Sequence, residues 1–562
     1  MKQTITSTTL PACSLMFAKP SQMSHTRPLV RLTASPIRPS AEICWGRGFA
    51  NNLTSRMRCS FPRRIDWDAM KRFVGIDLGT SSVKVVVTDE CGHVERMATR
   101  SYNISEPVPQ WREIDPMIWW KATAEASREI LEGYPASEIA GVGVTGQMHT
   151  LVCLDERDVP VCPAIMWNDL RSAELVSDAR TALADAGESY LARIISTGSP
   201  ALSLAWIKAN RPDVFSRIRT IVIAPDWIVK CLSGAIGTDW CEASTSSLFD
   251  LEKGIWSTTA CKSLGVPLHI LPEIQSADSI VGGVTKMAGE ASGIPAGTPV
   301  IRGTGDNPAS AIPTGCFGER VPVISLGTSG VLMYSLPGSI RAKWGKSVLF
   351  SESSGSLSTL IQLTIQTCGN AVDWLTREML RCPDYDLEDA RANDILYDTD
   401  RLIFYPFLNG DKTLYGDSSI RGAFVGISLE TSRSDLQRAV MEGISMGFRQ
   451  LLEHVDESGS WGEIRVVGGG AHSDLWMQIL SSVLSKQIVR LTGVKGAAQG
   501  AAMIAASAVR GIDLVTILQE LGKQEEAFEP NQQAVSMYER KYGAFLELHD
   551  AVGTLGAREF NR

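Results

Sequence analysis

The chain has 562 residues and a formal net charge of −8 at pH 7, with 44% hydrophobic and 21% charged residues. This composition is typical of a globular protein and excludes collagen-like, coiled-coil and wholly disordered classes, while the length favours two domains over one core. An acidic chain whose basic excess is confined to its first residues is not expected to bind nucleic acid. No apolar run approaches the ~18 residues of a membrane helix, so no membrane partner is predicted.

The 12 cysteines are scattered along the chain, and no two stand in the Cys-x-x-Cys spacing that is typical of zinc and redox sites. Cysteines placed in this way usually serve as small core residues in a reducing compartment. We therefore expect a cytoplasmic protein.

Residues 1–69 differ from the rest of the chain, because they are rich in Ser, Thr, Pro and Arg and contain no acidic residue before Glu42. Three interpretations remain open: an organelle-targeting peptide, which has this composition, a disordered tail, or upstream sequence translated from a wrongly chosen start. Met70 is followed at once by the apolar strand Phe73–Ile76, as at the beginning of a compact cytosolic enzyme, which favours the wrong start. Under all three, the segment carries no chemistry.

From Met70 onward, short β-branched runs alternate with longer helical stretches, which is typical of α/β proteins. Leu78–Ser81 and Leu326–Ser329 are both Leu-Gly-Thr-Ser, and each lies between two strand-like runs. This repeat predicts two related domains that each offer one Gly-Thr-Ser turn to a shared cleft. The predicted domains are residues 70–317 and 318–525, followed by a C-terminal tail at 526–562.

A candidate phosphate-binding turn follows the first strand, in the run Asp77-Leu78-Gly79-Thr80-Ser81. Glycine lets several backbone N–H groups point into one concavity, and the hydroxyls of Thr80 and Ser81 add donors that can wrap phosphate oxygens. Asp77, at the end of the strand, could hold Mg²⁺ directly or through water, since phosphoryl transfer needs a hard cation beside the nucleotide. The alternative is an ordinary hairpin turn in which Gly79 supplies a positive φ.

A candidate sugar pocket comes next, where Gln147, Met148 and His149 follow the apolar strand Val142–Val144. An amide, an apolar thioether and an imidazole at the carboxyl end of a strand suit a ligand of an open α/β sheet, because such ligands bind at that edge. His149 is one of only 7 histidines in the chain. It could equally be a hydrogen-bonded core histidine.

A candidate general base lies before the domain boundary, in the run Gly303-Thr304-Gly305-Asp306-Asn307. An aspartate held by glycines after an apolar run can face a cleft and accept the proton of a substrate hydroxyl as it attacks the γ-phosphate. Asn307 could hydrogen-bond a neighbouring hydroxyl. The alternative is an Asx-turn, because Asp and Asn favour such loops in any case.

Two further glycine motifs lie in the second domain. Gly327-Thr328-Ser329 has the same two interpretations as the first turn, a phosphate loop or a hairpin. Gly469-Gly470-Ala471 follows a strand-like run, and Ser473 is placed to cap the next helix. Glycines let a flat ligand such as adenine lie against bare backbone, so this motif could supply the adenosine half of a nucleotide site. By itself it would be only a loop.

A long core helix is also predicted in the second domain. Ser434, with Gln437 three residues later, has the pattern of a capping box, and apolar residues then recur every three or four positions up to Val455. We expect Ser434 to be the N-cap of this helix.

Taken in order, these motifs resemble those of the FGGY carbohydrate kinases and, within that family, those of the xylulokinases. The motifs are Asp-x-Gly-Thr-Ser, Gly-Gln-Met-His, Trp-Asn-Asp, Gly-Asp-Asn, Leu-Gly-Thr-Ser-Gly and Gly-Gly-Gly-Ala. The resemblance extends from about Met70 to beyond Ala502. Six motifs in order are specific, whereas any one of them is not.

The resemblance implies two actin-like (ribonuclease H-like) domains, with ATP and a sugar in the cleft between them. It implies that Asp306 is the catalytic base and that Asp77 holds Mg²⁺. The implied sugar-binding residues are Gln147, Met148, His149 and Asn307. The implied nucleotide-binding residues are Asp77, Gly79, Thr80, Ser81, Gly327, Thr328, Ser329, Gly469, Gly470 and Ala471.

The resemblance therefore predicts ATP-dependent phosphorylation of a sugar hydroxyl, with D-xylulose converted to D-xylulose 5-phosphate. The chain departs from common xylulokinase sequence at Thr304, at Asp411-Lys412 and at Leu202-Ser203. These departures leave another pentulose or a tetritol open as the substrate. An interpretation of another class is a non-catalytic nucleotide switch, which would have no use for a sugar pocket. Oligomeric state is left open, with a homodimer as one option.

Overall fold

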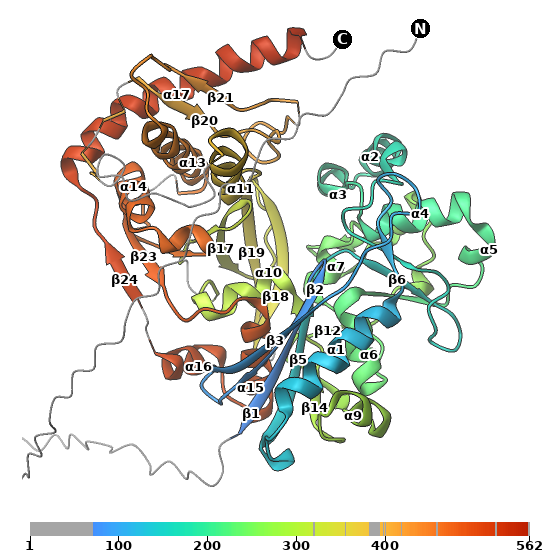
Figure 1. Cartoon of the computed structure of the whole chain (residues 1–562). Coiled ribbons are helices and arrows are strands. Elements are labelled where there is room, and N and C mark those ends of the chain that lie inside the picture. Colours follow the sequence, from blue (N-terminus) through green and yellow to red (C-terminus); the bar gives the residue numbers. More distant parts are fainter. Residues whose placement is uncertain are drawn as a thin grey trace, which may run out of the picture. The chain divides into compact units, whose positions relative to one another are not determined.

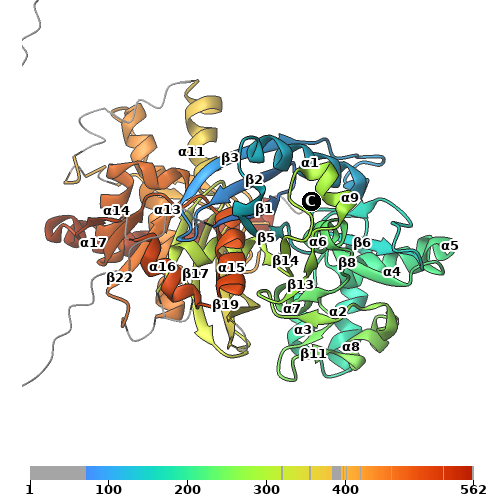
Figure 2. The ribbon, with the colours of Figure 1, turned by 90° about the horizontal axis from the view of Figure 1, so that it is seen from below.

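The computed structural model describes residues 71–559 except 318–320, 354–355, 382–393, 397, 400, 418, 457–458 and 523–524. The extension predicted at residues 1–69 lies outside the described residues, as does the start of the second domain at 318. Figures 1 and 2 show the described chain from two directions.

The first domain is built on a seven-stranded mixed sheet in the order β13-β14-β5-β1-β2-β3, with β15 also paired to β5. The strands β1, β2 and β3 form an antiparallel meander, whereas β5 runs parallel to β1 and β14 runs parallel to β5. The strands are β1 (Arg72–Leu78), β2 (Ser82–Thr88), β3 (Val94–Ser101), β5 (Ile139–Gly146), β13 (Ile280–Gly283), β14 (Pro299–Ile301) and β15 (Thr304–Gly305).

The second domain repeats this arrangement in a seven-stranded sheet of order β18-β19-β17-β16-β22-β23-β24. Here β16, β17 and β19 form the antiparallel meander, while β22 runs parallel to β16 and β23 parallel to β22. The strands are β16 (Val323–Leu326), β17 (Gly330–Pro337), β18 (Lys346–Ser353), β19 (Ser356–Ile365), β22 (Glu463–Val467), β23 (Gln487–Leu491) and β24 (Glu525–Phe528).

The repeated tetrapeptide occupies the same place in both sheets. Gly79–Ser81 joins β1 to β2, and Gly327–Ser329 joins β16 to β17, in each case between the first two strands of the meander. The sequence prediction of two related α/β domains is therefore confirmed by the topology.

Helices and short strands complete each domain. In the first domain the helices are α1 (Pro116–Leu131), α2 (Val176–Asp185), α3 (Ser189–Ile194), α4 (Pro200–Asn210), α5 (Pro212–Phe215), α6 (Ala224–Ser233), α7 (Trp240–Thr245), α8 (Thr258–Ser263), α9 (Lys286–Ser292) and α10 (Asp306–Ala311). Its short strands are β4 (Glu113–Ile114), β6 (Leu151–Leu154), β7 (Ala164–Ile165), β8 (Thr220–Ile223), β9 (Thr238–Asp239), β10 (Phe249–Asp250), β11 (Ile255–Trp256) and β12 (Ile274–Gln275). Later in the chain come α11 (Gly369–Asp373), β20 (Ile403–Tyr405), β21 (Ala423–Val425), α13 (Arg433–Val455), α14 (Asp474–Leu484), α15 (Ala497–Arg510), α16 (Leu514–Leu521) and α17 (Gln532–Glu559).

The N-cap of the long helix α13 lies two residues earlier than predicted. Its N-cap is Ser432, whose hydroxyl accepts from the N–H of Asp435 (3.2 Å) while the Asp435 carboxylate accepts from the N–H of Ser432 (2.7 Å). Ser434 and Gln437 have the same spacing, but a carboxylate in the first turn also interacts favourably with the helix dipole. The predicted N-cap at Ser434 is therefore wrong, whereas the helix itself is present.

The helix α15 covers a face of the first sheet although it lies late in the chain, and it contacts both β1 and β5 (Figures 1 and 2). Glycines allow this close approach. A Cβ atom at Gly75 would lie 1.9 Å from the carbonyl oxygen of Ala498, and one at Gly143 would lie 1.9 Å from that of Ala501. The helix backbone thus rests directly on the strands that lead to the candidate site.

Residues 526–559, predicted as a tail, form the end of β24 and the helix α17. Tyr538 and Phe545 of α17 are fully buried in the core that also holds Ile444 and Phe448 of α13. Because these side chains belong to the core of the second domain, the C-terminal helix is part of that domain.

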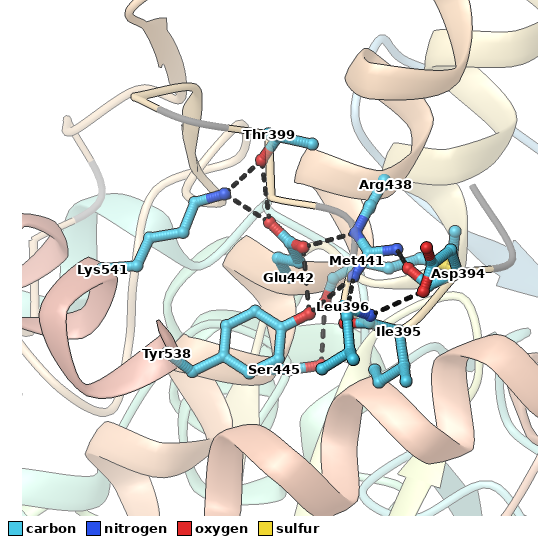
Figure 3. Close-up of polar contacts among 10 residues, drawn as sticks. All are labelled: Asp394, Ile395, Leu396, Thr399, Arg438, Met441, Glu442, Ser445, Tyr538 and Lys541. Carbon is cyan, nitrogen blue, oxygen red and sulfur yellow. Dashed lines mark hydrogen bonds and ion pairs between the residues drawn. The ribbon is translucent and has the colours of Figure 1, made fainter. Parts of the chain in front are cut away.

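A buried polar network joins α17 to α13 (Figure 3). Glu442 of α13 accepts hydrogen bonds from Arg438 (2.8 Å), Tyr538 (3.0 Å) and Lys541 (2.6 Å). Lys541 also donates to Thr399, whose hydroxyl bonds to the same carboxylate. A buried carboxylate with two cationic partners and a phenol is well satisfied, so the network holds the two helices in register.

Among the described residues, no single helix is both long and apolar enough to cross a membrane. The helices α15 and α16 pass that test only as a pair, and they are bent by 119°.

Candidate active site

The first glycine turn is held tightly by its surroundings. The carbonyl oxygen of Gly79 accepts from the Gln147 amide (3.2 Å) and from the Tyr102 hydroxyl, and the carbonyl of Ser81 accepts from the N–H of Tyr102 (3.0 Å). The Trp167 indole N–H donates to the hydroxyl of Thr80 (3.1 Å). That hydroxyl therefore keeps its own hydrogen for an acceptor such as a phosphate oxygen.

Gln147 supports this turn from beneath. Its side chain is 2% exposed, its Nε2 donates to Gly79 and its Oε1 accepts from Thr150 (3.2 Å). Both ends of the amide are thus bonded within the protein. Gln147 therefore supports the loop, and its contact with a sugar stays a prediction.

The second glycine turn is anchored to the start of α11. The N–H of Gly369 donates to the carbonyl of Gly327 (2.8 Å), and those of Cys368 and Asn370 donate to the carbonyl of Thr328 (each 3.2 Å). The carbonyl groups of Gly327 and Thr328 thus accept hydrogen bonds from the backbone at the start of α11. A turn so fixed can present its N–H groups and the Thr328 and Ser329 hydroxyls as a preformed anion site.

The third glycine motif ends β22 and precedes α14, as predicted. Gly468 has φ 98°, Gly469–His472 form one 3₁₀ turn, and the Ser473 hydroxyl caps α14 by accepting from the N–H of Trp476 (3.2 Å). A Cβ at Gly470 would lie 2.8 Å from Leu326 and Trp476, whereas one at Gly469 would meet nothing within 4 Å. Gly469 therefore exposes bare backbone against which a flat ring could lie.

Asp306 is the first residue of α10 and follows β15, which pairs with β5. Burial and the charge of Asp77 raise the pKa of Asp306 to about 7, against the opposing effect of Lys346. The carboxyl group of Asp77, beside the first phosphate turn, and that of Asp306, the candidate base, therefore interact electrostatically. A carboxylate that takes up a proton near neutral pH suits general-base chemistry.

Met148 and Asn307 meet beside this carboxylate. The Asn307 amide donates to the Met148 sulfur (3.4 Å) and to Gln362 Oε1 (3.1 Å). Gly305 is required by this packing, because a Cβ there would lie 2.6 Å from Met148 and 2.7 Å from the sulfur of Cys241.

His149 has the left-handed backbone value φ 70°, which is uncommon outside glycine. Its N–H donates to Glu242 Oε2 (3.3 Å), and its Nε2 lies 2.7 Å from Lys346 Nζ. Burial, followed by the charge of Lys346, holds the pKa of His149 well below its usual value. The ring is therefore neutral at physiological pH.

Three polar atoms in this region are buried and lack a hydrogen-bond partner among the described residues: His149 Nδ1, Glu242 Oε1 and Gln362 Nε2. Buried polar groups are nearly always satisfied, so such a cluster indicates missing partners. A polyhydroxylated ligand could supply them.

Glu242, Lys346 and Gln362 were missed by the sequence predictions. Glu242 lies on α7, whereas Lys346 and Gln362 lie opposite each other on the paired strands β18 and β19 of the second domain. None of them belongs to a glycine motif, and only the fold brings them to Asp306. Of the residues that the sequence predicted for the sugar pocket, Met148, His149 and Asn307 lie in this same region.

A buried ion cluster lies behind Glu242. Asp226 and Asp239 are 3% and 2% exposed, and burial raises their pKa values to about 7 and about 6. Arg302, also buried, lies 3.8 Å from Asp226 and donates to Gln275 (2.9 Å). Burial first, and then Asp239 and Asp226, raise the pKa of Glu242 well above its usual value.

Asp77 fits the requirements for a hard cation. It stands at the end of β1 next to the first phosphate turn, and the described residues give its carboxylate no hydrogen-bond partner. Burial raises its pKa, and the charge of Lys84 offsets this rise only in part. Carboxylate oxygens of this kind are the ligands that Mg²⁺ prefers.

Two family models match the chain, in the same order as the two sheets. The N-terminal domain of the FGGY family of carbohydrate kinases matches residues 72–313, and the C-terminal domain of that family matches residues 323–509. The chain belongs to the FGGY family of carbohydrate kinases.

Similar proteins match this chain over nearly the whole of their own length. The xylulose kinase of Staphylococcus xylosus is 30% identical over 78% of this chain and 91% of its own. The structure of a xyloylose kinase from Brucella ovis is 29% identical, with a TM-score of 0.78 over 86% of this chain and 100% of that one. A Plasmodium falciparum glycerol kinase with ADP has a TM-score of 0.74 over 85% of this chain and 98% of that one, at 22% identity. Together with the repeated sheet topology, these matches confirm the predicted actin-like fold.

Proposed function

We propose that this protein transfers the γ-phosphoryl group of ATP to a hydroxyl of a pentulose, with D-xylulose giving D-xylulose 5-phosphate as the preferred reaction. The observation that carries the proposal is the carboxyl group of Asp306, which lies at the start of α10 beside buried polar atoms that have no hydrogen-bond partner among the described residues. Family membership supports the reaction class, and the similarity to xylulose kinases supports the sugar.

In the proposed reaction, a sugar hydroxyl attacks the γ-phosphorus while Asp306 accepts its proton. A new oxygen–phosphorus bond forms, and the bond from the γ-phosphorus to the bridging oxygen breaks, which releases ADP. The turns Gly79–Ser81 and Gly327–Ser329 hold phosphate oxygens through backbone N–H groups and hydroxyls, and Gly469 leaves room for adenine. Mg²⁺, for which Asp77 is the candidate ligand, supplies charge neutralisation on the nucleotide when bound.

Two alternatives to this proposal are a different substrate for the same reaction and a different function. Another pentulose or a tetritol would use the same base and loops, and the likeness to a glycerol kinase motivates testing polyols. A non-catalytic nucleotide switch would hydrolyse ATP irrespective of sugar. Membership of a carbohydrate kinase family and the polar pocket beside Asp306 both favour the kinase.

The proposal is tested by measuring ADP formation with D-xylulose, L-ribulose, erythritol and glycerol, with the phosphorylated product identified by ³¹P NMR. We expect ATP turnover to rise on addition of sugar, with the highest kcat/KM for D-xylulose. If erythritol or glycerol is the best substrate, the xylulose assignment is wrong and the broader kinase assignment stands. ATP hydrolysis that no sugar or polyol stimulates would favour the nucleotide switch.

A further inference from the structure

Lys346 of the second domain reaches into the sugar pocket of the first. It begins β18, and β18 is fixed against α7 because the N–H of Leu349 donates to the hydroxyl of Ser244 (3.1 Å). Lys346 Nζ lies 2.7 Å from His149 Nε2. The lysine is therefore a built part of the pocket wall and not a loose surface side chain.

The direction of the hydrogen bond between Lys346 and His149 follows from chemistry. Burial lowers the pKa of Lys346 to about 8, while Cys241, Glu242 and Asp306 oppose the change. An amine with this pKa is mainly an ammonium at pH 7, and an ammonium can only donate. Nε2 of the neutral imidazole must therefore accept, which places the ring hydrogen on Nδ1.

The carbonyl of Thr245 acts on the same ring and favours its protonation. Its effect is consistent with a hydrogen on Nδ1. Lys346 on β18 is thus the charged group that contacts the imidazole, whereas Glu242 on α7 accepts from the backbone N–H of His149.

Lys346 and Gln362 together present several unused donors. Their Cα atoms are direct register partners on β18 and β19, so their side chains stand side by side on one face of the sheet. His149 is the only hydrogen-bond partner that the described residues give the ammonium, which has three N–H groups. Gln362 gives its Oε1 to Asn307, and its Nε2 is buried without a partner.

We propose that Lys346 and Gln362 form the second-domain wall of the sugar pocket and recognise, through their N–H groups, a substrate oxygen that carries no hydrogen: the carbonyl oxygen of a ketose. This inference rests on the proposed function and narrows its substrate class. A carbonyl oxygen can only accept, so a wall of donors complements it. A site built to pair one polar group rejects analogues that lack this group far more strongly than it rejects changes in size.

The test compares D-xylulose with xylitol and D-arabinitol, the two polyols obtained by reducing its carbonyl. Calorimetric binding without ATP and kcat/KM with ATP are measured for the wild type, Lys346→Met and Gln362→Leu. We expect the wild type to bind the ketose more tightly than either polyol. We expect Lys346→Met to weaken D-xylulose binding and kcat/KM roughly ten- to hundredfold, the cost of losing a charged hydrogen bond, and to change both polyols less than about threefold.

Lys343→Met is the matched control, because Lys343 is an exposed lysine three residues before Lys346 on the same segment. Lys343→Met should leave the preference for D-xylulose over xylitol and over D-arabinitol unchanged. Equal losses for ketose and polyols in Lys346→Met would overturn carbonyl recognition. So would a wild type that binds D-xylulose no better than the polyols.

A second measurement does not depend on any substrate. Imidazole ¹⁵N NMR of the free protein, with the His149 signal identified by its loss in His149→Gln, reports the tautomer and the titration of this ring. In the wild type we expect the Nδ1–H tautomer and a depressed pKa. In Lys346→Met we expect the pKa of His149 to rise, because the neighbouring cation is gone.

These readouts separate the two proposals. A wild type that prefers the ketose in binding but phosphorylates no sugar would contradict the proposed function and support the inference. Unchanged titration of His149 in Lys346→Met would instead show that the lysine does not contact the ring, and would overturn the inference even if D-xylulose were the substrate.

Discussion

At the scale of single residues, the proposed chemistry centres on Asp306, whose surroundings raise its pKa toward neutrality. Burial and Asp77 raise its pKa, Lys346 lowers it, and the result is about 7. A base with this pKa is largely ionised at physiological pH and still has a strong tendency to take a proton from a hydroxyl.

Replacing this base tests its role. Asp306→Asn keeps the volume of the side chain but removes the proton acceptor, so we expect sugar phosphorylation to fall roughly 10²- to 10⁴-fold. ATP affinity, measured by calorimetry, should stay near the wild-type value, because the glycine turns that we propose as the nucleotide contacts are unchanged. Turnover close to that of the wild type would remove Asp306 from the mechanism.

The pKa of Asp306 also predicts the pH dependence. The base acts when it is ionised, and its pKa is raised to about 7, so kcat/KM for the sugar should fall as the pH drops below about 7. This acid limb is measured with a buffer series from pH 5.5 to about 8.5. In Asp306→Asn the residual activity should lack the limb; a limb that persists there would have to be assigned to another group.

At the scale of elements, the site depends on how closely the helix α15 approaches β1 and β5. Asp77 is the second-last residue of β1, and β5 ends just before Gln147 and the proposed sugar pocket, so the packing of α15 positions both. The absence of a side chain at Gly75 and Gly143 makes this approach feasible.

A methyl group at this contact should be costly. Gly143→Ala would place a Cβ 1.9 Å from the backbone oxygen of Ala501, and backbone cannot move aside as a flexible side chain can. We expect a loss of about 1–3 kcal/mol in the free energy of unfolding, measured by urea denaturation. Gly462→Ala, where a Cβ meets nothing within 4 Å, is the control and should be near neutral.

At the scale of the whole molecule, residues far apart in the chain complete each domain. The network around Glu442 joins α13 to α17 near the C-terminus (Figure 3). Burial raises the pKa of Glu442, but Lys541 and Arg438 outweigh it, so the net pKa is lowered. The stability from this network is therefore present at neutral pH and is lost as the pH falls through the pKa of Glu442.

Breaking this network should destabilise the protein strongly. Lys541→Met leaves Glu442 without one of its buried cations, and removing one partner of a buried pair costs about 3–5 kcal/mol. The loss is measured as a shift in the urea midpoint at pH 7, and the shift should shrink in acid as Glu442 takes up a proton. Lys121→Met, which breaks an exposed pair with Glu125, should cost less than about 1 kcal/mol. Equal losses in the two variants would contradict the assigned role.

Short patterns in the sequence predict the local features of this protein. The turns at Gly79–Ser81 and Gly327–Ser329, the helix cap at Ser473 and the placement of Asp306 after two glycines follow from backbone freedom, hydroxyl capping and chain order. Each depends on residues that are neighbours in the chain, so short patterns were sufficient to predict them.

Packing between distant elements brings together the residues that share a site. Glu242, Lys346 and Gln362 lie on elements with no distinctive motif, and they meet His149 or Asn307 through packing between α7, β18 and β19. The start of α13 depends on the capping contact between Ser432 and Asp435, and the place of α17 in the second domain depends on its burial in the core of that domain. Contacts between residues far apart in the chain depend on the whole arrangement of both sheets, and no local pattern of residues encodes them.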